Sequence, residues 1–137
     1  GGVARAWKLY LIVSANQQFG SERVVRGDFT LASWVPVLSL ASGALPGDVI
    51  DAALPSRTNN RGLFAATQFE AARGGLVTFT LEGGASGVWL NGTPVAAGGH
   101  FTAEVRPGLN TIVLQIDPVE LPPVLRLGAS EVSFKTE

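Results

Sequence analysis

The chain has 137 residues, a formal net charge of −1, and neither cysteine nor methionine. Its ten basic residues are scattered, so we expect no basic patch for nucleic acid or an anionic membrane. The lack of cysteine excludes disulfides, thiolate metal sites and covalently attached haem. Apolar residues make up 46% of the chain, but no run approaches the ~18 residues of a membrane helix, so we expect a buried core and apolar contacts with other domains.

Three segments of the first forty residues are predicted to be extended strands: 3–14, 23–32 and 34–40. In the first, Trp7 and Leu9 alternate with Lys8 and Tyr10, so the two pairs are expected on opposite faces. In the third, Pro36 favours an edge position, because proline has no N–H for a central ladder.

The segment 42–60 is rich in glycine, proline and small polar residues and is predicted to be irregular. Only a short turn of helix is expected in it, within residues 45–51. As the one place for a sizeable loop, it is where binding residues are expected, because long loops on rigid scaffolds often carry binding.

Alternation is regular from residue 62 onward. Asn91-Gly92 predicts a type I′ hairpin turn, and Pro107-Gly108 predicts a second tight connection. Together they predict a meander of about three strands across residues 88–116. Short period-two runs with glycine or proline between them are typical of an all-β, antiparallel β-sandwich.

The sequence contains no recognisable catalytic or metal-binding pattern. His100 is the only histidine and is expected to face solvent at the start of a strand. No Gly-X-Ser-X-Gly elbow occurs, and the loop acids lack the spacing of a calcium loop. We therefore predict a chain that is not an enzyme, with no catalytic residue, no metal site and no cofactor.

Two places are candidates for ligand binding. Trp89 is expected on the face opposite Val88, where an exposed indole can stack on a sugar ring or pack against a neighbour. Asn59, Asn60 and Arg61 lie in a polar loop that supplies hydrogen-bond donors. Core packing for Trp89 and a solvated loop for the other three are the simpler alternatives.

The segment Val88-Trp-Leu-Asn-Gly-Thr-Pro-Val95 and the run from Phe101 to Ile116 resemble jelly-roll, galactose-binding-like modules attached to many secreted glycosidases. With residues 23–50, they also resemble the C-terminal β module of planctomycete-type multidomain proteins. Those proteins combine a dehydrogenase-like propeller, helical repeats and a cytochrome c-type haem domain. This resemblance implies an extracytoplasmic location, periplasmic or secreted. It implies no haem site in this chain, which has no Cys-X-X-Cys-His.

We therefore expect residues 1–137 to form a single β-sandwich domain, a fragment of a larger multidomain protein. The predicted role is a non-catalytic accessory or scaffold module whose partners are neighbouring domains or other protein chains. One alternative is a carbohydrate-binding module that uses Trp89, with Trp34 or Tyr10, beside the polar loop. The other is a self-associating subunit that pairs through an edge strand at 3–14 or 131–135. Nucleic-acid binding and membrane insertion are not expected.

Overall fold

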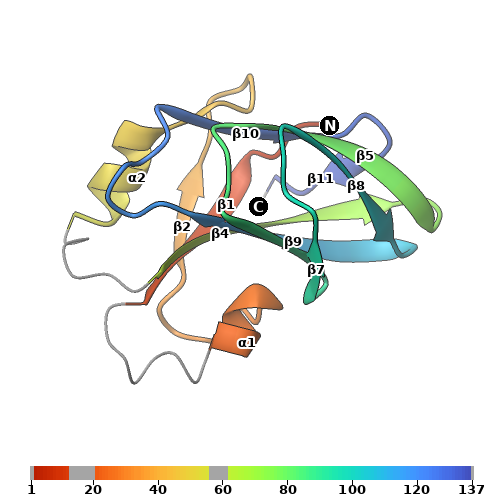
Figure 1. The fold of residues 1–137 in the computed structure, drawn as a ribbon, viewed down its shortest axis with the longest axis horizontal. Helices are drawn as coiled ribbons and strands as arrows, with labels where there is room; N and C mark the ends of the chain where they lie inside the picture. The colour runs from red at the N-terminus through yellow and green to blue at the C-terminus, as the bar shows by residue number, and fades with distance from the viewer. Residues whose placement is uncertain (1, 13–20, 56–61, 137) are drawn as a thin grey trace.

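The computed structural model describes residues 2–12, 21–55 and 62–136. Two antiparallel sheets pack face to face as a β-sandwich (Figure 1). The predicted fold class, an all-β antiparallel sandwich, is therefore confirmed.

The larger sheet contains seven strands. They run in the order β2-β1-β4-β9-β6-β7, and β11 pairs with β4 beyond the start of β1. Their bounds are β1 Ala6–Ile12, β2 Val35–Leu38, β4 Gly62–Ala71, β6 Gly87–Leu90, β7 Thr93–Val95, β9 Gly108–Ile116 and β11 Ser133–Phe134.

The smaller sheet contains four strands in the order β3-β10-β5-β8. Their bounds are β3 Leu45–Pro46, β5 Gly75–Glu82, β8 His100–Val105 and β10 Val124–Gly128. Two short helices complete the described chain: α1 Ser21–Val25 and α2 Gly47–Ala53. Figure 1 shows α2 at one end of the sandwich and α1 below the larger sheet.

The main core lies between the sheets, and period-two alternation supplies it. Along β5, Val77, Phe79 and Leu81 are buried while the residues between them are exposed. Phe69 of β4 packs its ring 5.5 Å from that of Phe79, which joins the two layers. Burial of such side chains is the main favourable term in folding. The alternation predicted from residue 62 onward is therefore confirmed along β5.

The predicted strand over residues 23–32 is wrong. The segment instead forms the end of α1 followed by turns, with Gly27 N–H bonded to Val24 O at 2.8 Å. Gly27 has φ +69°, and a Cβ there would collide with the side chain of Thr111. The alternation of Phe29 and Leu31 with polar neighbours imitates a strand. The glycine and the Asp28 turn decide the local structure instead.

The predicted three-stranded meander is only partly present. Asn91 and Gly92 have φ values of 50° and 83° and close the hairpin between β6 and β7, as the type I′ prediction requires. However, β8 pairs with β5 in the smaller sheet, whereas β9 pairs with β4 and β6 in the larger one. The Pro107-Gly108 connection therefore passes from one sheet to the other.

Asn110 fastens this crossing. It is fully buried, and its Oδ1 accepts hydrogen bonds from Arg106 N–H at 3.0 Å and Asn91 Nδ2 at 2.9 Å. Its Nδ2 donates to the carbonyls of Arg106 at 2.8 Å and Gly108 at 3.0 Å. A buried amide must satisfy both ends, and here both are satisfied. The asparagine therefore joins the crossing turn to the β6–β7 hairpin.

The predicted edge at residues 3–14 is also wrong, because β1 pairs with β2 on one side and β4 on the other. Over residues 131–135, only Ser133–Phe134 forms a strand, and it pairs with β4. The strands that end the two sheets are β2, β7, β3 and β8. As predicted, Pro36 lies in an edge strand, β2.

Candidate functional site

The outer face of the larger sheet carries a second apolar cluster, separate from the main core. Its buried strand residues are Tyr10, Ile12, Phe64, Ala66 and Val113. Val24 of α1 packs onto them and is 1% exposed. Outward strand positions in a sandwich are usually polar, so this apolar face requires a cover.

Part of that cover is the loop that leads from α1 to β2. Trp34 packs edge-on against Tyr10 and Phe29, with ring centroids 5.1 Å apart in both pairs. Such T-shaped contacts are favourable beyond the area they bury. The three rings therefore form one continuous aromatic wall on the outer face.

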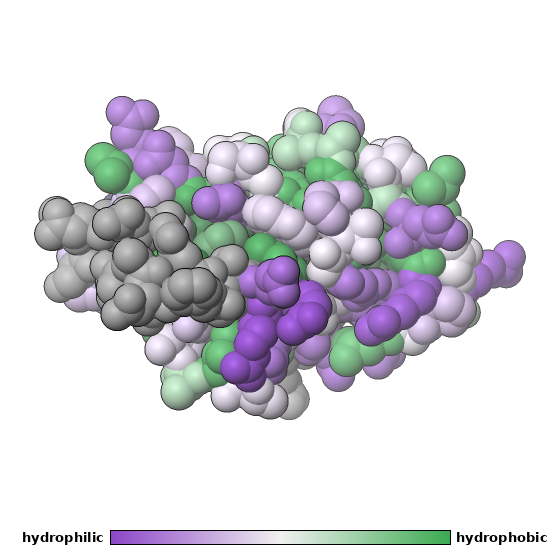
Figure 2. All heavy atoms as spheres, turned by 60° about the horizontal axis from the view of Figure 1, so that its bottom comes forward, coloured by the Kyte–Doolittle hydropathy of each residue, from purple (hydrophilic) through white to green (hydrophobic). Residues whose placement is uncertain are grey.

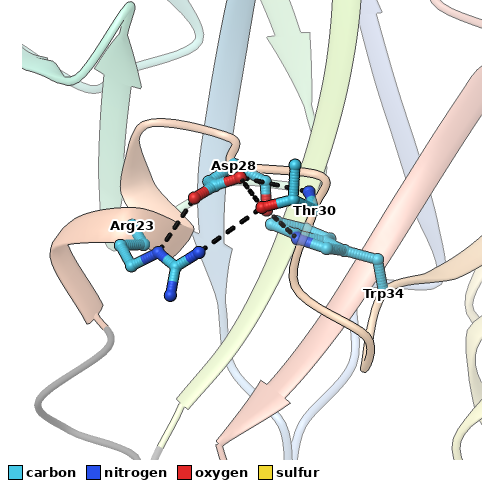
Figure 3. A network of polar contacts seen from close by, with 4 residues as sticks. All are labelled: Arg23, Asp28, Thr30 and Trp34. Carbon is cyan, nitrogen blue, oxygen red and sulfur yellow. Dashed lines mark hydrogen bonds and ion pairs between the residues drawn. The ribbon is translucent and has the colours of Figure 1, made fainter.

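A polar network holds this loop in shape (Figure 3). The Asp28 carboxylate accepts hydrogen bonds from Arg23 Nε at 2.9 Å and from the amide and hydroxyl of Thr30. Trp34 Nε1 donates to the Asp28 carbonyl at 2.8 Å. Hydrogen bonds from the Thr30 hydroxyl, the Arg23 side chain and the Thr30 amide lower the pKa of Asp28 from 3.8 to about 2. The carboxylate therefore stays ionised and its acceptors stay occupied at neutral pH.

Beside the aromatic wall, a groove of about 520 Å³ opens on the outer face. Its lining comes from the start of β1, the middle of β4, β2, the loop before β2 and the segment after β11. The lining residues with apolar side chains are Ala6, Trp7, Phe29, Pro36, Val37, Leu38 and Ala66. The polar ones are Lys8, Thr67, Gln68, Lys135 and Thr136. Figure 2 shows hydrophobic and hydrophilic residues interspersed on this side of the molecule.

Two lysines give the groove its charge. Lys8 lies with its Nζ 4.1 Å from the centre of the Phe29 ring, a cation–π contact that positions the ammonium group. Lys135 is exposed, and its backbone N–H bonds to Gln68 O at 2.9 Å. Among the described residues that line the groove, none is an aspartate or glutamate. The described lining therefore combines apolar walls with two positive charges.

The β2 side of the groove continues into an exposed apolar shoulder. Leu38 lines the groove and is 62% exposed, and Leu40 just beyond it is 58% exposed. Large apolar side chains that adjoin an apolar groove are typical of interaction sites. This shoulder extends the apolar surface past the groove itself.

Trp89 lies on the same outer face, at the other side of the sheet. As predicted, it is on the face opposite Val88, which is 1% exposed in the main core. Its ring lies 6.1 Å from that of Phe64 and leans over Gly87, where an added Cβ would meet the indole at 2.7 Å. Trp89 is half-buried and does not line the groove.

The other aromatic residues proposed for carbohydrate contact, Tyr10 and Trp34, belong to the same outer-face cluster as Trp89. Tyr10 is only 8% exposed, and Trp34 is half-buried against it. Asn59, Asn60 and Arg61 lie outside the described residues. Their roles as ligand-binding residues stay predictions.

His100 is exposed at the start of β8, as expected. Within residues 2–12, 21–55 and 62–136, no group of three or more histidine or acidic side chains is arranged to hold a metal ion. None of the helices in this part of the chain is long and apolar enough to cross a membrane.

No sequence pattern marks Lys8, Phe29, Leu38 or Lys135 as parts of one site. The alternation of β1 does place Lys8 on the outer face, and that was the one available signal. The others reach the groove through long-range pairing: Ala6 with Leu38, and Gln68 with Lys135. No local sequence pattern predicts that these distant residues lie close together.

Neither models of protein families nor curated protein sequences give a match to this chain.

Proposed function

We propose that this chain is a non-catalytic interaction module that docks a segment of another domain or protein chain in the groove on its outer face. The observation that carries the proposal is the exposed leucine pair, Leu38 and Leu40, beside an apolar groove. Covering such surface on binding is favourable by about 25 cal/mol per Å² before association costs are subtracted.

The hydrogen bonding of β2 supports docking through side chains rather than strand addition. Ser39 N–H bonds to Arg5 O at 2.8 Å, across the pair of β2 with β1. The backbone polar groups of the alternate residues, Pro36 and Leu38, therefore point to the free edge of the sheet. Pro36 has no N–H, and the N–H of Leu40 is already bonded to Ala44 O at 2.9 Å. An incoming strand would find Leu38 as its main donor, which is too few for a stable ladder.

The test is a selection of short random peptides displayed on phage against the purified domain. Fluorescence anisotropy then gives the affinity of the selected peptides for wild type and for Leu38→Ser. Because Leu38 contributes apolar area to the docked surface, we expect Leu38→Ser to weaken binding about tenfold.

Leu76→Ser is the matched control, since Leu76 is 71% exposed on the outer face of the smaller sheet and does not line the groove. We expect it to bind as wild type does. The proposal fails if no peptide is enriched, or if Leu38→Ser and Leu76→Ser bind the selected peptides equally well.

A further inference from the structure

We infer that the segment docked in this groove carries a carboxylate beside its apolar side chains, and that Lys8 and Lys135 bind it. The inference rests on the proposed function and specifies the chemistry of the partner. The occupant is an acidic, apolar peptide segment, not a basic or neutral one.

The distribution of lysine in the chain points to this chemistry. The chain has only two lysines, Lys8 near its beginning and Lys135 near its end, and both line the same groove. The remaining eight cations are arginines, and none of those within residues 2–12, 21–55 and 62–136 lines it. In a chain of net charge −1, the groove is therefore a local concentration of positive charge.

No carboxylate of the described residues pairs with either ammonium group. Within the described part of the chain, the only ion pair is that of Arg23 with Asp28, so neither lysine has a carboxylate partner. Lys8 is half-buried, and its Nζ lies over Phe29 at the groove wall. An ammonium group held over an aromatic ring can still donate hydrogen bonds outward, and its partly apolar surroundings strengthen attraction to an anion.

The apolar lining of the groove favours a ligand with apolar side chains beside its carboxylate. Phe29, Pro36 and Leu38 offer hydrophobic contacts, whereas no described residue of the lining provides a carboxylate for a basic group. A lysine or arginine of a partner would meet two like charges, and an uncharged segment would leave the lysines without a counter-charge. A segment with leucine-like side chains and an aspartate or glutamate satisfies both features.

The amino-acid composition of the phage-selected peptides is the first measurement. We expect enrichment of aspartate or glutamate next to apolar residues. Each selected peptide is then synthesised with its carboxylates and again as the amide form, in which asparagine and glutamine replace the acids. The acidic form is expected to bind the wild-type domain about fivefold to tenfold more tightly, with an advantage that shrinks as salt is raised.

The double variant Lys8→Gln, Lys135→Gln should lose that advantage and bind both peptide forms alike. Lys8→Arg with Lys135→Arg keeps the charge and should preserve the preference, which shows that the glutamine variant fails through charge rather than misfolding. Arg73→Gln is the matched control, because Arg73 is exposed and outside the groove.

Selected peptides without acids, or equal binding of the acidic and amide forms, would overturn this inference. In that case, a loss of affinity in Leu38→Ser would show that docking in the groove still holds. If Leu38→Ser also has no effect, the proposed function itself fails.

Discussion

The outer faces of the two sheets are built from the same alternating pattern but differ in chemistry. On the smaller sheet, Thr78, Thr80 and Thr102 point outward and are exposed. On the larger sheet, the corresponding outward positions include Phe64 and Val113, which are 5% and 0% exposed. The outer face of the smaller sheet is therefore suited to contact with water, whereas the apolar outer face of the larger sheet is more stable when other protein segments cover it.

That difference supports the proposed position of the docking surface. The loop with α1 covers one part of the apolar face, and the remaining part is the groove next to Leu38. A hydrophobic face that is covered in one part and open in another is a natural docking surface. The polar face of the smaller sheet has no comparable reason to bind.

The largest expected effect comes from testing whether the outer cluster is a true second core. Phe64→Ala removes a buried ring and should lower the free energy of unfolding by about 3 to 4 kcal/mol. Thr78→Ala, on the polar face, should cost less than about 1 kcal/mol. Urea denaturation followed by circular dichroism measures both. An equal loss of unfolding free energy in the two variants would contradict the proposed difference between the two outer faces.

A smaller effect is expected where the loop is fastened to the apolar face. Trp34→Phe keeps an aromatic ring but loses the 2.8 Å hydrogen bond to the Asp28 carbonyl, at a cost of about 1 kcal/mol. Amide hydrogen exchange should speed up in residues 26–34. Trp89→Phe changes an indole elsewhere on the same face and should leave exchange in this loop unaltered; faster exchange there too would contradict a specific role for Trp34.

The smallest effect is the pH dependence of the same loop. Because the pKa of Asp28 is lowered from 3.8 to about 2 in the folded protein, the ionised carboxylate stabilises the fold. This contribution is present above the unfolded value and is lost as pH falls toward the folded one. Asp28→Asn should therefore be less stable than wild type near neutral pH, and the gap should narrow below about pH 4. Unfolding midpoints in urea at several pH values measure the gap, and a constant gap would refute the role of the charge.

Much of the sandwich could be predicted because alternation is a local property. The inward faces of β4, β5, β8 and β9 and the Asn91-Gly92 turn all follow from neighbouring residues. The helical turn predicted within 45–51 is present as α2, which is longer than predicted and ends at Ala53. The same reasoning gave a wrong prediction for residues 23–32, which were expected to form a strand. There, Phe29 and Leu31 alternate as in a strand, but their aromatic and aliphatic side chains cover a sheet face instead of belonging to it.

The candidate site was far less predictable. Alternation places Lys8 on the outer face, yet it cannot show that Lys135 returns to the same place. Similarly, Asn110 follows a predicted turn, but its four hydrogen bonds depend on Asn91 lying next to it in space.

The sequence by itself therefore determined the all-β class, the inward face of most strands and the type of the sharpest turn. Each of these depends on residues a few positions apart. The tertiary structure alone decided which strands other than β2 lie at edges, that β8 and β9 belong to different sheets, and that both lysines line one groove. These features depend on which distant segments pair, and the free energy of that pairing is spread over the whole sandwich.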